Sequence, residues 1–428
     1  MSAIEVRGEV DDRAIEQLKR CALAGDAPYA ALCADGHVGY SQPIGGVVAY
    51  RDFISPSGVG YDIGCGNKAV KTNIKVADID VARVMDEIAS RISFGMGRNN
   101  DEPVDHPVIE QIANANFHPQ RKFVQSASNQ LGTVGAGNHY VDLFSDEDGN
   151  LWVGVHFGSR GFGHKTASGF LALAAGLEFA EHAPEGEMDS PPVLLATDSD
   201  LGQSYIEAMT LAGDYAYAGR DVVVSKVLEI LGADSLFEVH NHHNYAWREE
   251  HSGEKLWVVR KGCTPAFPGQ QGFVGATMGE PSVILEGIES EAGPRLLYST
   301  VHGAGRVMSR TKAAGKVRRR KQQVCLNRDC EQVFGPNESC PDHPEANTRK
   351  IWVTEQKSPG LIDWLAVLAE LGAKKIELRG GAADEAPGAY KRLDAVLDAH
   401  SDTISIRHRL FPIGVAMAGS DIYDPWKD

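Results

Sequence analysis

The sequence predicts an α+β protein with a single domain, in which mixed β-sheets are covered by helices. Three observations lead to this prediction. The chain has 428 residues, of which 43% are hydrophobic and 23% charged, so it can bury a sizeable core. Segments with helical spacing of apolar residues alternate with short apolar runs that end at glycines. No internal repeat or low-complexity linker interrupts the chain, so residues 1–428 are expected to fold as one unit.

The first element of the chain is a predicted helix at 12–24. Asp11 is a suitable N-cap for it, and apolar residues recur at helical spacing from Ile15 to Ala22. Further helices are expected at 79–92, 165–182, 203–231, 361–371 and 387–399. Strands are expected at 34–40, 43–50, 131–143, 151–164, 238–245, 255–259, 274–278, 283–285, 296–300 and 404–416.

Charge and composition limit the class of protein. The formal charge of −16 argues against a protein that coats nucleic acids, because cationic side chains drive phosphate binding. A local basic groove remains compatible with that charge. No N-terminal signal pattern and no run of about 18 apolar residues is present, so we expect a cytoplasmic protein with no membrane partner. The seven cysteines, an odd number, suit a reducing compartment.

Residues 58–67 contain a carboxylate and a thiol three positions apart, at Asp62 and Cys65, among glycines. Glycine lets the backbone come close to an ion. A sulfur ligand beside a hard oxygen ligand suits a transition ion such as manganese, iron, cobalt or zinc. The alternative is a tight turn with a buried cysteine. Histidines further along the chain favour the metal site.

Four strings place histidine beside glycine or asparagine: residues 135–140, 156–164, 240–244 and 302–306. A single histidine is more often structural than catalytic, but four such strings indicate a histidine-rich site. The neighbouring asparagines could orient an imidazole that binds a metal, or they could bind phosphate.

His302 differs from the other histidines because it opens the string His-Gly-Ala-Gly-Arg after an apolar strand. Free backbone amides and the guanidinium of Arg306 can hold phosphate oxygens there. An imidazole in that position can attack an activated phosphorus and carry a nucleotidyl group. The alternative is an anion-binding turn whose histidine takes no part in chemistry.

Together these motifs resemble those of the RtcB family of RNA ligases. The resemblance is carried by residues 62–66, 137–139, 156–161, 242–244, 302–306 and 384–391, and it runs from about residue 35 to residue 390. It implies an architecture particular to that family. It also implies a GTP- and Mn²⁺-dependent ligase of tRNA splicing or RNA repair. Such an enzyme joins RNA ending in a 2′,3′-cyclic phosphate or 3′-phosphate to RNA with a 5′-hydroxyl, and an activating helper protein is a candidate partner.

The resemblance further implies the ligands of two metal ions. Cys65 would bridge the ions, with Asp62 and His139 completing one site and His156 and His243 the other. We choose His243 over His240 and His242 because the family's ligand precedes asparagine, although His240 precedes Asn241 as well.

His302 matches the family's guanylylated histidine, and Asp35 and His37 fall in a motif near the metals. The residues implied to bind the nucleotide are Asn138, Asp142, Asn244, Thr277, Gly303, Ala304, Gly305 and Tyr390. Those implied to hold phosphate or RNA are Arg160, Lys261, Arg306 and Arg310.

The chain departs from the family at two positions that read guanine. Asp142 stands where family members usually carry glutamate, and Ala418 stands where they usually carry lysine. A shorter carboxylate and a missing ammonium bear directly on the choice of base. Lys427, in the extra C-terminal tail, is a candidate substitute for the missing ammonium.

The reaction implied by the resemblance begins with guanylylation of His302, after which the RNA phosphate takes up the guanylyl group and the 5′-hydroxyl displaces GMP. Two other functions stay open at this point. A metal-dependent phosphoesterase that opens cyclic phosphates would use the metal ligands without His302. A structural protein that binds RNA or zinc would need neither.

The one clear break in composition is an insert at 318–347, which is basic and then rich in cysteine and turn-forming residues. Its Cys325, Cys330, Cys340 and His343 have the composition of a structural Zn²⁺ site, the alternative being an exposed loop with free thiols. A basic run at 310–321 leads into it. That run is either a solvated helix face or a contact for the RNA backbone.

Overall fold

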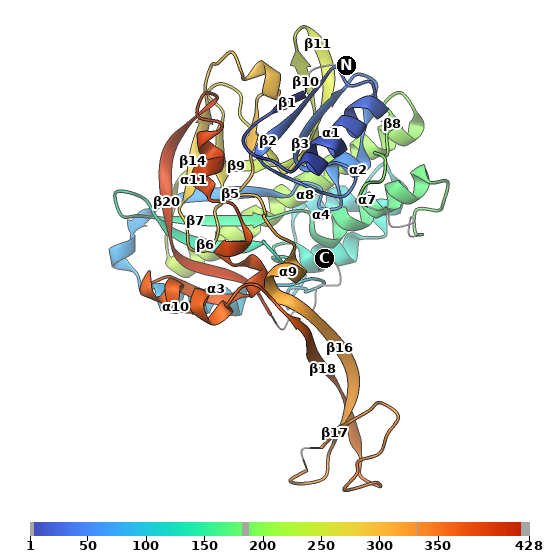
Figure 1. Ribbon diagram of the computed structural model, residues 1–428, viewed down its shortest axis with the longest axis vertical. Coiled ribbons are helices and arrows are strands. Elements are labelled where there is room, and N and C mark those ends of the chain that lie inside the picture. The colour runs from blue at the N-terminus through green and yellow to red at the C-terminus, as the bar shows by residue number, and fades with distance from the viewer. Residues whose placement is uncertain (1–3, 182–187, 331, 421–428) are drawn as a thin grey trace.

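The structure is a computed structural model that describes residues 4–181, 188–330 and 332–420. Two large sheets form the body, with helices packed around them (Figure 1). The five-stranded sheet has the order β1 (Ile4–Val6), β2 (Tyr29–His37), β3 (Ile44–Tyr50), β11 (Glu254–Lys261), β10 (Asn244–His251). The eight-stranded sheet has the order β13 (Gln271–Val274), β14 (Ser282–Gly287), β20 (Ile404–Gly419), β6 (Tyr140–Ser145), β7 (Asn150–Phe157), β5 (Gly66–Lys75), β9 (Ser235–His242), and β19 (Glu377–Gly381) pairs with β20.

Smaller sheets complete the strand pairing. They are β12 (Cys263–Pro265) with β15 (Ser299–Val301), β4 (Phe53–Ile54) with β8 (Leu195–Ala196), and the set β17 (Val333–Phe334), β16 (Gly315–Cys325), β18 (Thr348–Pro359). The α-helices are α1 (Asp12–Ala24), α2 (Pro56–Val59), α3 (Val81–Arg91), α4 (Pro107–Ala113), α5 (His118–Arg121), α6 (Val124–Gln130), α7 (Arg160–Ala174), α8 (Asp200–Leu231), α9 (Arg310–Ala314), α10 (Trp364–Ala373) and α11 (Leu393–Asp398). The predicted mixture of helices and several sheets is confirmed.

Helix α8 connects the cores of the two sheets. It has 32 residues and is therefore about 48 Å long. Its first half contributes Tyr205, Met209 and Tyr215 to a core shared with α1, α7 and the five-stranded sheet. Its second half contributes Val223 and Val227 to a core shared with α3 and the eight-stranded sheet. One helix thus fixes both sheets relative to each other.

Arg220 lies between these two halves of α8 and is fully buried. Its Nη1 donates hydrogen bonds to the carbonyl oxygens of Gly64 at 2.9 Å and Phe157 at 2.6 Å, and its Nε donates to His240 at 2.8 Å. Gly64 precedes Cys65, and Phe157 follows His156. The guanidinium therefore holds the turn that leads into β5, which contains Gly64 and Cys65, against the end of β7, which contains His156 and Phe157.

Most predicted elements agree with the structure, and the differences have physical causes. The helices expected at 12–24, 79–92 and 203–231 are α1, α3 and α8, and Asp11 caps α1 as expected. The strands expected at 131–143 and 151–164 are wrong over part of their length, because β6 begins at Tyr140 and β7 ends at Phe157. Glycines 132, 135 and 137 hold the first segment in a loop instead.

Two helix predictions need correction, and several short helices were not predicted. Helix α7 starts at Arg160 and ends at Ala174, earlier than the expected 165–182, whose last residue lies outside the described part of the chain. The expected helix at 387–399 is a 3₁₀ turn at Pro387–Ala389 followed by α11. Helices α4, α5 and α6 were not predicted, since each has only four to seven residues.

The basic run lies on a strand from residue 315 onward, and not on a helix. β16 and β18 pair antiparallel over their length and form an arm that projects from the body (Figure 1). The predicted insert at 318–347 therefore belongs to a longer hairpin. Among the described residues, none of the helices has both the length and the apolar character that crossing a membrane requires.

Candidate active site

A cavity of about 330 Å³ opens where the large sheets meet, and the predicted metal-binding residues lie on its wall. The lining includes Asp62, Cys65, His139, His156, His243 and His302. These residues come from loops and strands that are far apart in the sequence. The register of the large sheet brings several of them together, because Asn67 and Tyr140 both lie opposite His156 on neighbouring strands.

Asp62 and Cys65 lie in a turn between α2 and β5. The turn is closed by a hydrogen bond from the amide of Cys65 to the carbonyl oxygen of Asp62, at 3.0 Å. Gly64 has a φ of 70°, which a residue with a side chain rarely adopts. A Cβ at Gly158 would lie 2.2 Å from Asp62 Oδ1, so glycine is required there as well. The glycines around this motif thus leave room for its carboxylate.

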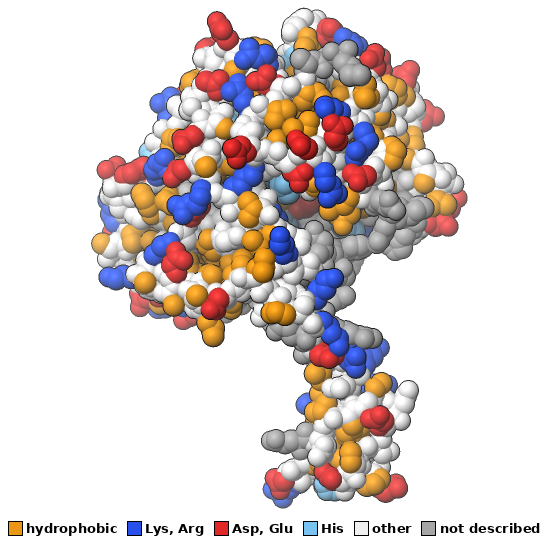
Figure 2. Space-filling view, viewed as in Figure 1, with side chains coloured by type: hydrophobic (Ala, Val, Ile, Leu, Met, Phe, Trp, Pro, Cys, Tyr) orange, Lys and Arg blue, Asp and Glu red, His pale blue; other side chains and the backbone are white. Residues whose placement is uncertain are grey.

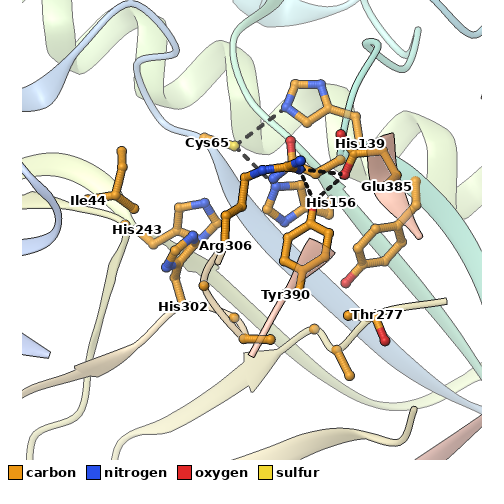
Figure 3. A pocket seen from close by; sticks show the side chains of 18 of the residues that line it. Ile44, Cys65, His139, His156, His243, Thr277, His302, Arg306, Glu385 and Tyr390 are labelled. Atoms are coloured by element: carbon orange, nitrogen blue, oxygen red, sulfur yellow. Dashed lines mark hydrogen bonds and ion pairs between the residues drawn. The ribbon is translucent and has the colours of Figure 1, made fainter. Parts of the chain in front are cut away.

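The ligand atoms of these side chains lie at distances that a shared metal ion would set. Cys65 Sγ is 3.7 Å from His139 Nε2 and 3.5 Å from His156 Nε2, and His139 Nε2 is 3.1 Å from Asp62 Oδ2 (Figure 3). Two groups result, one of Asp62, Cys65 and His139 and one of Cys65, His156 and His243, each with its ligand atoms within 4.8 Å of one another. Ligands about 2.0–2.3 Å from one ion lie about 3–4 Å apart, so both groups fit a metal.

The second nitrogen of His156 is oriented by Asn67. His156 Nδ1 donates to Asn67 Oδ1 at 2.6 Å, which leaves Nε2 with a free electron pair toward Cys65. Asn67 is itself held by a hydrogen bond from its Nδ2 to the carbonyl oxygen of Phe273 at 2.9 Å. Sequence analysis assigned Asn67 no role, although it closes the motif that contains Cys65.

The buried histidines are in the form that binds metals. Burial, together with nearby positive charges, lowers the pKa of His156 and His243 well below its ordinary value, so both imidazoles are neutral. Within the described structure, Nδ1 of His139 and Nδ1 of His243 are buried and have no hydrogen-bond partner. Neutral imidazoles grouped around a thiol and a carboxylate match the donor set of a transition ion.

Of the three neighbouring histidines, His243 is the one on the cavity wall. His240 accepts a hydrogen bond from Arg220, and His242 Nδ1 lies 2.9 Å from the carbonyl oxygen of Gly64. Neither residue lines the cavity, and each is engaged by a group next to the segment that contains Cys65. This arrangement agrees with the choice of His243 made from the sequence.

His302 is fixed by a buried carboxylate. Its Nδ1 lies 2.6 Å from Asp35 Oδ2, and the same oxygen accepts a hydrogen bond from the backbone amide of His302 at 3.0 Å. Burial alone would raise the pKa of Asp35, but the charge and hydrogen bonds of His302 hold that pKa below its ordinary value. The ring of His302 is 4.9 Å from that of His243 (Figure 3). Asp35 was expected in a motif near the metals, and its side chain bonds to His302, which lies beside the candidate ligand His243.

The loop after His302 packs tightly against the segment that contains Asp35. A Cβ at Gly305 would lie 2.2 Å from the carbonyl oxygen of Asp35, and Gly305 has a φ of 76°. Glycine is therefore required at this position. Gly303, Ala304 and Gly305 all line the cavity, as predicted for a phosphate-binding string.

Arg306 and Arg310 point into the cavity within a network of carboxylates. Arg306 donates to Tyr390 Oη at 2.8 Å, and its guanidinium lies 4.8 Å from the centre of the Tyr390 ring. Glu385 forms ion pairs with both arginines and accepts a hydrogen bond from the Tyr390 hydroxyl. Glu385 lies in the motif at 384–391, but the sequence did not indicate a role for it. Its carboxylate partly neutralises Arg306 and Arg310, the two arginines that could bind a phosphate.

Asp142 and Thr277 also line the cavity and offer polar atoms to a ligand. Asp142 Oδ1 and Thr277 Oγ1 are buried, and neither has a partner among the described residues. Burial raises the pKa of Asp142 well above its ordinary value. Asn138 and Asn244 also line the cavity, and Asn138 is exposed.

Arg160, Lys261 and Asp35, which the sequence singled out, are not among the residues that line the cavity. Arg160 donates to the carbonyl oxygen of Gly95 at 2.8 Å and to Thr133 at 3.2 Å. The Lys261 ammonium donates to the carbonyl oxygen of Tyr40 at 2.6 Å. Ala418 is not among the residues that line the cavity, and Lys427 lies outside the described residues. The four predicted zinc ligands lie together at the far end of the arm.

The fold and this site define a candidate metalloenzyme with thiolate and imidazole ligands beside a carboxylate-bound histidine. Comparison with known proteins identifies the family. Residues 17–375 match the family RtcB, described as tRNA-splicing ligase RtcB. Because the match covers most of the chain, the protein belongs to the RtcB family.

Several relatives resemble the chain over most of their length. The RNA-splicing ligase RtcB of Escherichia coli K12 is 28% identical, with 89% of this chain and 88% of the relative covered. The tRNA-splicing ligase RtcB of Archaeoglobus fulgidus is 29% identical, with 94% and 90% covered. The tRNA-splicing ligase RtcB of Pyrobaculum aerophilum is 30% identical, with 68% and 75% covered.

Replacing Cys65 with alanine should remove the one ligand that both metal groups share. We expect the Cys65→Ala protein to lose tightly bound divalent transition ions from both groups, as measured by plasma mass spectrometry after dialysis. Asn67→Ala should weaken metal binding about 10–100-fold, because His156 loses the acceptor that orients it. Cys21→Ala is the matched control, since Cys21 is buried outside both groups. An unchanged metal content in the Cys65→Ala protein would contradict the assignment.

Proposed function

We propose that this protein is a GTP- and Mn²⁺-dependent RNA ligase. It joins RNA ending in a 2′,3′-cyclic phosphate or 3′-phosphate to RNA with a 5′-hydroxyl, through a guanylyl group carried by His302. The observation that carries the proposal is the position of His302, which shares one cavity with two thiolate-linked groups of metal ligands and is held there by Asp35. Family membership supports the choice of RNA as the substrate. The seven unpaired cysteines suit a cytoplasmic setting.

The donor sets of the two groups fit a pair of divalent ions. Asp62, Cys65 and His139 would hold one ion, and Cys65, His156 and His243 the other. Such ions would neutralise charge on the phosphates and activate the phosphorus toward attack. The protein supplies the rest of the chemistry through His302 and the side chains around it.

His302 is the nucleophile in the proposed reaction. Because its Nδ1 is engaged by Asp35, its Nε2 carries the electron pair. A bond forms from Nε2 to the α-phosphorus of GTP while the bond to the β-phosphate oxygen breaks, and pyrophosphate leaves. The RNA 3′-phosphate then takes the guanylyl group from His302, and attack by the 5′-hydroxyl on that phosphate forms the phosphodiester and releases GMP.

The remaining cavity residues position the nucleotide. Arg306 and Arg310 can share their positive charge between Glu385 and a phosphate, and the backbone amides after His302 can bind phosphate oxygens. Tyr390 offers a ring face for the base. Asp142 Oδ1 and Thr277 Oγ1, which have no hydrogen-bond partner among the described residues, are available to the base edge.

Replacing His302 with alanine should abolish covalent nucleotide on the protein while leaving the metal content near that of the parent. The measurement is intact-protein mass after incubation with Mn²⁺ and each of the four nucleoside triphosphates. Asp35→Asn should slow guanylylation about 10²–10⁴-fold, because the carboxylate that orients the imidazole is lost. We expect a GMP adduct on the parent only.

The other outcomes of this experiment are equally informative. An adduct that persists on the His302→Ala protein would overturn the assignment of the nucleophile. An adduct from another triphosphate would show that the base site has changed. Turnover of a cyclic phosphate with no adduct on the parent would instead identify a phosphoesterase.

The affinity for GTP should rise with pH through the titration of Asp142. Burial raises the pKa of its carboxyl group, and guanine offers N–H donors that prefer the ionised form. Below the raised pKa the carboxyl is protonated and binding weakens, and above that pKa it is fully available as an acceptor. Isothermal titration calorimetry over a pH series that begins at the ordinary range of a carboxyl group and extends upward should show this dependence in the parent. Asp142→Asn should bind GTP less tightly with a flatter pH profile, and identical profiles would contradict the role of Asp142.

A further inference from the structure

The far end of the arm gathers four metal-binding side chains that are separated in the sequence. Cys325 ends β16, Cys330 follows a turn, and Cys340 and His343 lie in the loop before β18. Their ligand atoms all lie within 4.8 Å of one another. Cys325 and Cys340 are buried. The loops that carry these residues lie at the end of the arm that is away from the body, next to β17 (Figure 1).

The distances within this cluster match a tetrahedral site. Cys330 Sγ and Cys340 Sγ are 3.7 Å apart, and His343 Nδ1 lies 3.9 Å from Cys340 Sγ and 4.0 Å from Cys325 Sγ. Three thiolates at about 2.3 Å and one imidazole at about 2.0 Å from a Zn²⁺ ion would be about 3.5–3.8 Å apart. A disulfide requires about 2.05 Å between the sulfurs, and all seven cysteines are unpaired.

The end of the arm has too little apolar surface to fold by burial alone. Its core consists of Cys325, Phe334 and Cys340, with Cys330 and Ala346 partly buried against them. Three of these five residues are candidate ligands. A segment this small is normally held by a metal ion or by disulfides. The candidate ligands therefore make up most of the small core of these loops.

We propose that Cys325, Cys330, Cys340 and His343 bind one Zn²⁺ ion and that this ion folds the end of the arm. Each thiol would lose its proton on binding, and His343 would bind as the neutral imidazole through Nδ1. All four positions around the ion are filled by the protein, as in structural zinc sites. The ion would have no role in catalysis.

The zinc content of purified full-length protein tests this proposal. We expect one Zn²⁺ per chain in the parent and none in the Cys330→Ser/Cys340→Ser double variant, measured by plasma mass spectrometry. Cys65→Ala should keep this zinc, and Cys21→Ser is the control for loss of a cysteine outside the cluster. A second variant, with residues 326–347 replaced by a two-residue Asn-Gly turn, removes the cluster without leaving unfolded loops.

Two results would overturn the proposal. One is equal zinc in the parent, the double variant and the shortened variant. The other is a parent protein that contains no zinc and whose mass, measured after denaturation without reductant, is two hydrogens lower than the mass after reduction. That result would identify a disulfide. Loss of zinc together with faster proteolysis of residues 326–347 would support a structural role for the ion.

The strands of the arm differ in charge from the rest of the protein. β16 and β18 together contain eight Lys and Arg and one Glu, whereas residues 326–347 contain one Arg and five Asp and Glu. The whole chain carries −16. Figure 2 shows Lys and Arg side chains gathered on the part of the arm next to the body. Positive charge is thus concentrated on the two strands.

An exposed aromatic ring lies within this basic surface. Trp352 is 56% exposed and lies opposite Lys321 across the strand pair, with the ammonium 5.2 Å from the centre of the ring. Lys350, exposed and two residues away on β18, shares the face of Trp352. An aromatic ring bordered by cations is the surface on which single-stranded nucleic acids stack.

The basic strands begin at the cavity. Helix α9 carries Arg310, which lines the cavity, and β16 follows this helix directly. We infer, resting on the proposed function, that the strands of the arm bind the single-stranded RNA next to the end held in the cavity. The basic charge would suit RNA or an acidic protein, and the exposed ring of Trp352 favours RNA, because bases stack on it and carboxylates do not.

Binding of a fluorescent single-stranded RNA with a 3′-phosphate tests this inference. Lys321→Ala/Lys350→Ala should weaken binding and should reduce the slope of log affinity against log salt by about 1.4, since two cations are lost. Trp352→Ala should weaken binding with little change in this slope. Arg328→Ala, at the far end of the same arm, is the matched control for loss of one charge.

Guanylylation of His302 by GTP is measured in parallel, because it needs no RNA. Normal guanylylation with weakened RNA binding in the strand variants supports the inference. Unchanged affinity and unchanged salt slope in both strand variants would overturn it, whether or not His302 is guanylylated. Failure of guanylylation in the parent would contradict the proposed function alone.

Discussion

The candidate active site depends on one buried guanidinium. Arg220 donates hydrogen bonds to the carbonyl oxygens of Gly64 and Phe157, which are next in sequence to the candidate metal ligands Cys65 and His156. It also donates a hydrogen bond to His240. Burial lowers its pKa to about 10, so it stays charged at neutral pH. An unpaired buried charge is costly, and here the carbonyl dipoles and nearby side chains offset that cost. Because α8 belongs to both cores, the position of Cys65 relative to His156 is set by the packing of the whole body.

A second fixed point lies on the other side of the cavity. Asp35 comes from β2 of the five-stranded sheet, whereas His302 follows β15, and the two residues are 267 positions apart. One carboxylate oxygen accepts both the backbone amide and the ring N–H of His302, which fixes the position and the tautomer of the imidazole together. The cavity therefore joins the candidate metal-ligand groups next to the eight-stranded sheet to His302, which Asp35 of the five-stranded sheet holds in place.

The sequence predicted the residues whose chemistry is evident within a short motif. Asp62, Cys65 and the histidines stand among glycines, and the structure brings these residues to one cavity. The motifs in the sequence include Asn67, Asp35 and Glu385 but did not indicate their partners, because His156, His302 and Arg310 are distant from them along the chain. The same limit explains why a strand was wrongly expected to begin at residue 131. The backbone conformation there depends on tertiary contacts and on glycines, and β6 begins only at Tyr140. The domain boundaries remain a prediction.

The two regions that could hold metals differ in a way that bears on their roles. Each group at the cavity offers three protein ligands and shares one of them, which leaves positions for substrate oxygens. The cluster on the arm offers four ligands, three of them thiolates, which fill a tetrahedral ion and favour zinc over manganese. Open coordination with a hard oxygen ligand suits exchange during a reaction, whereas closed thiolate coordination suits folding. Ligand number and softness would therefore separate the proposed structural ion of the arm from the proposed ions of the cavity, even where both sites meet the same mixture of metals.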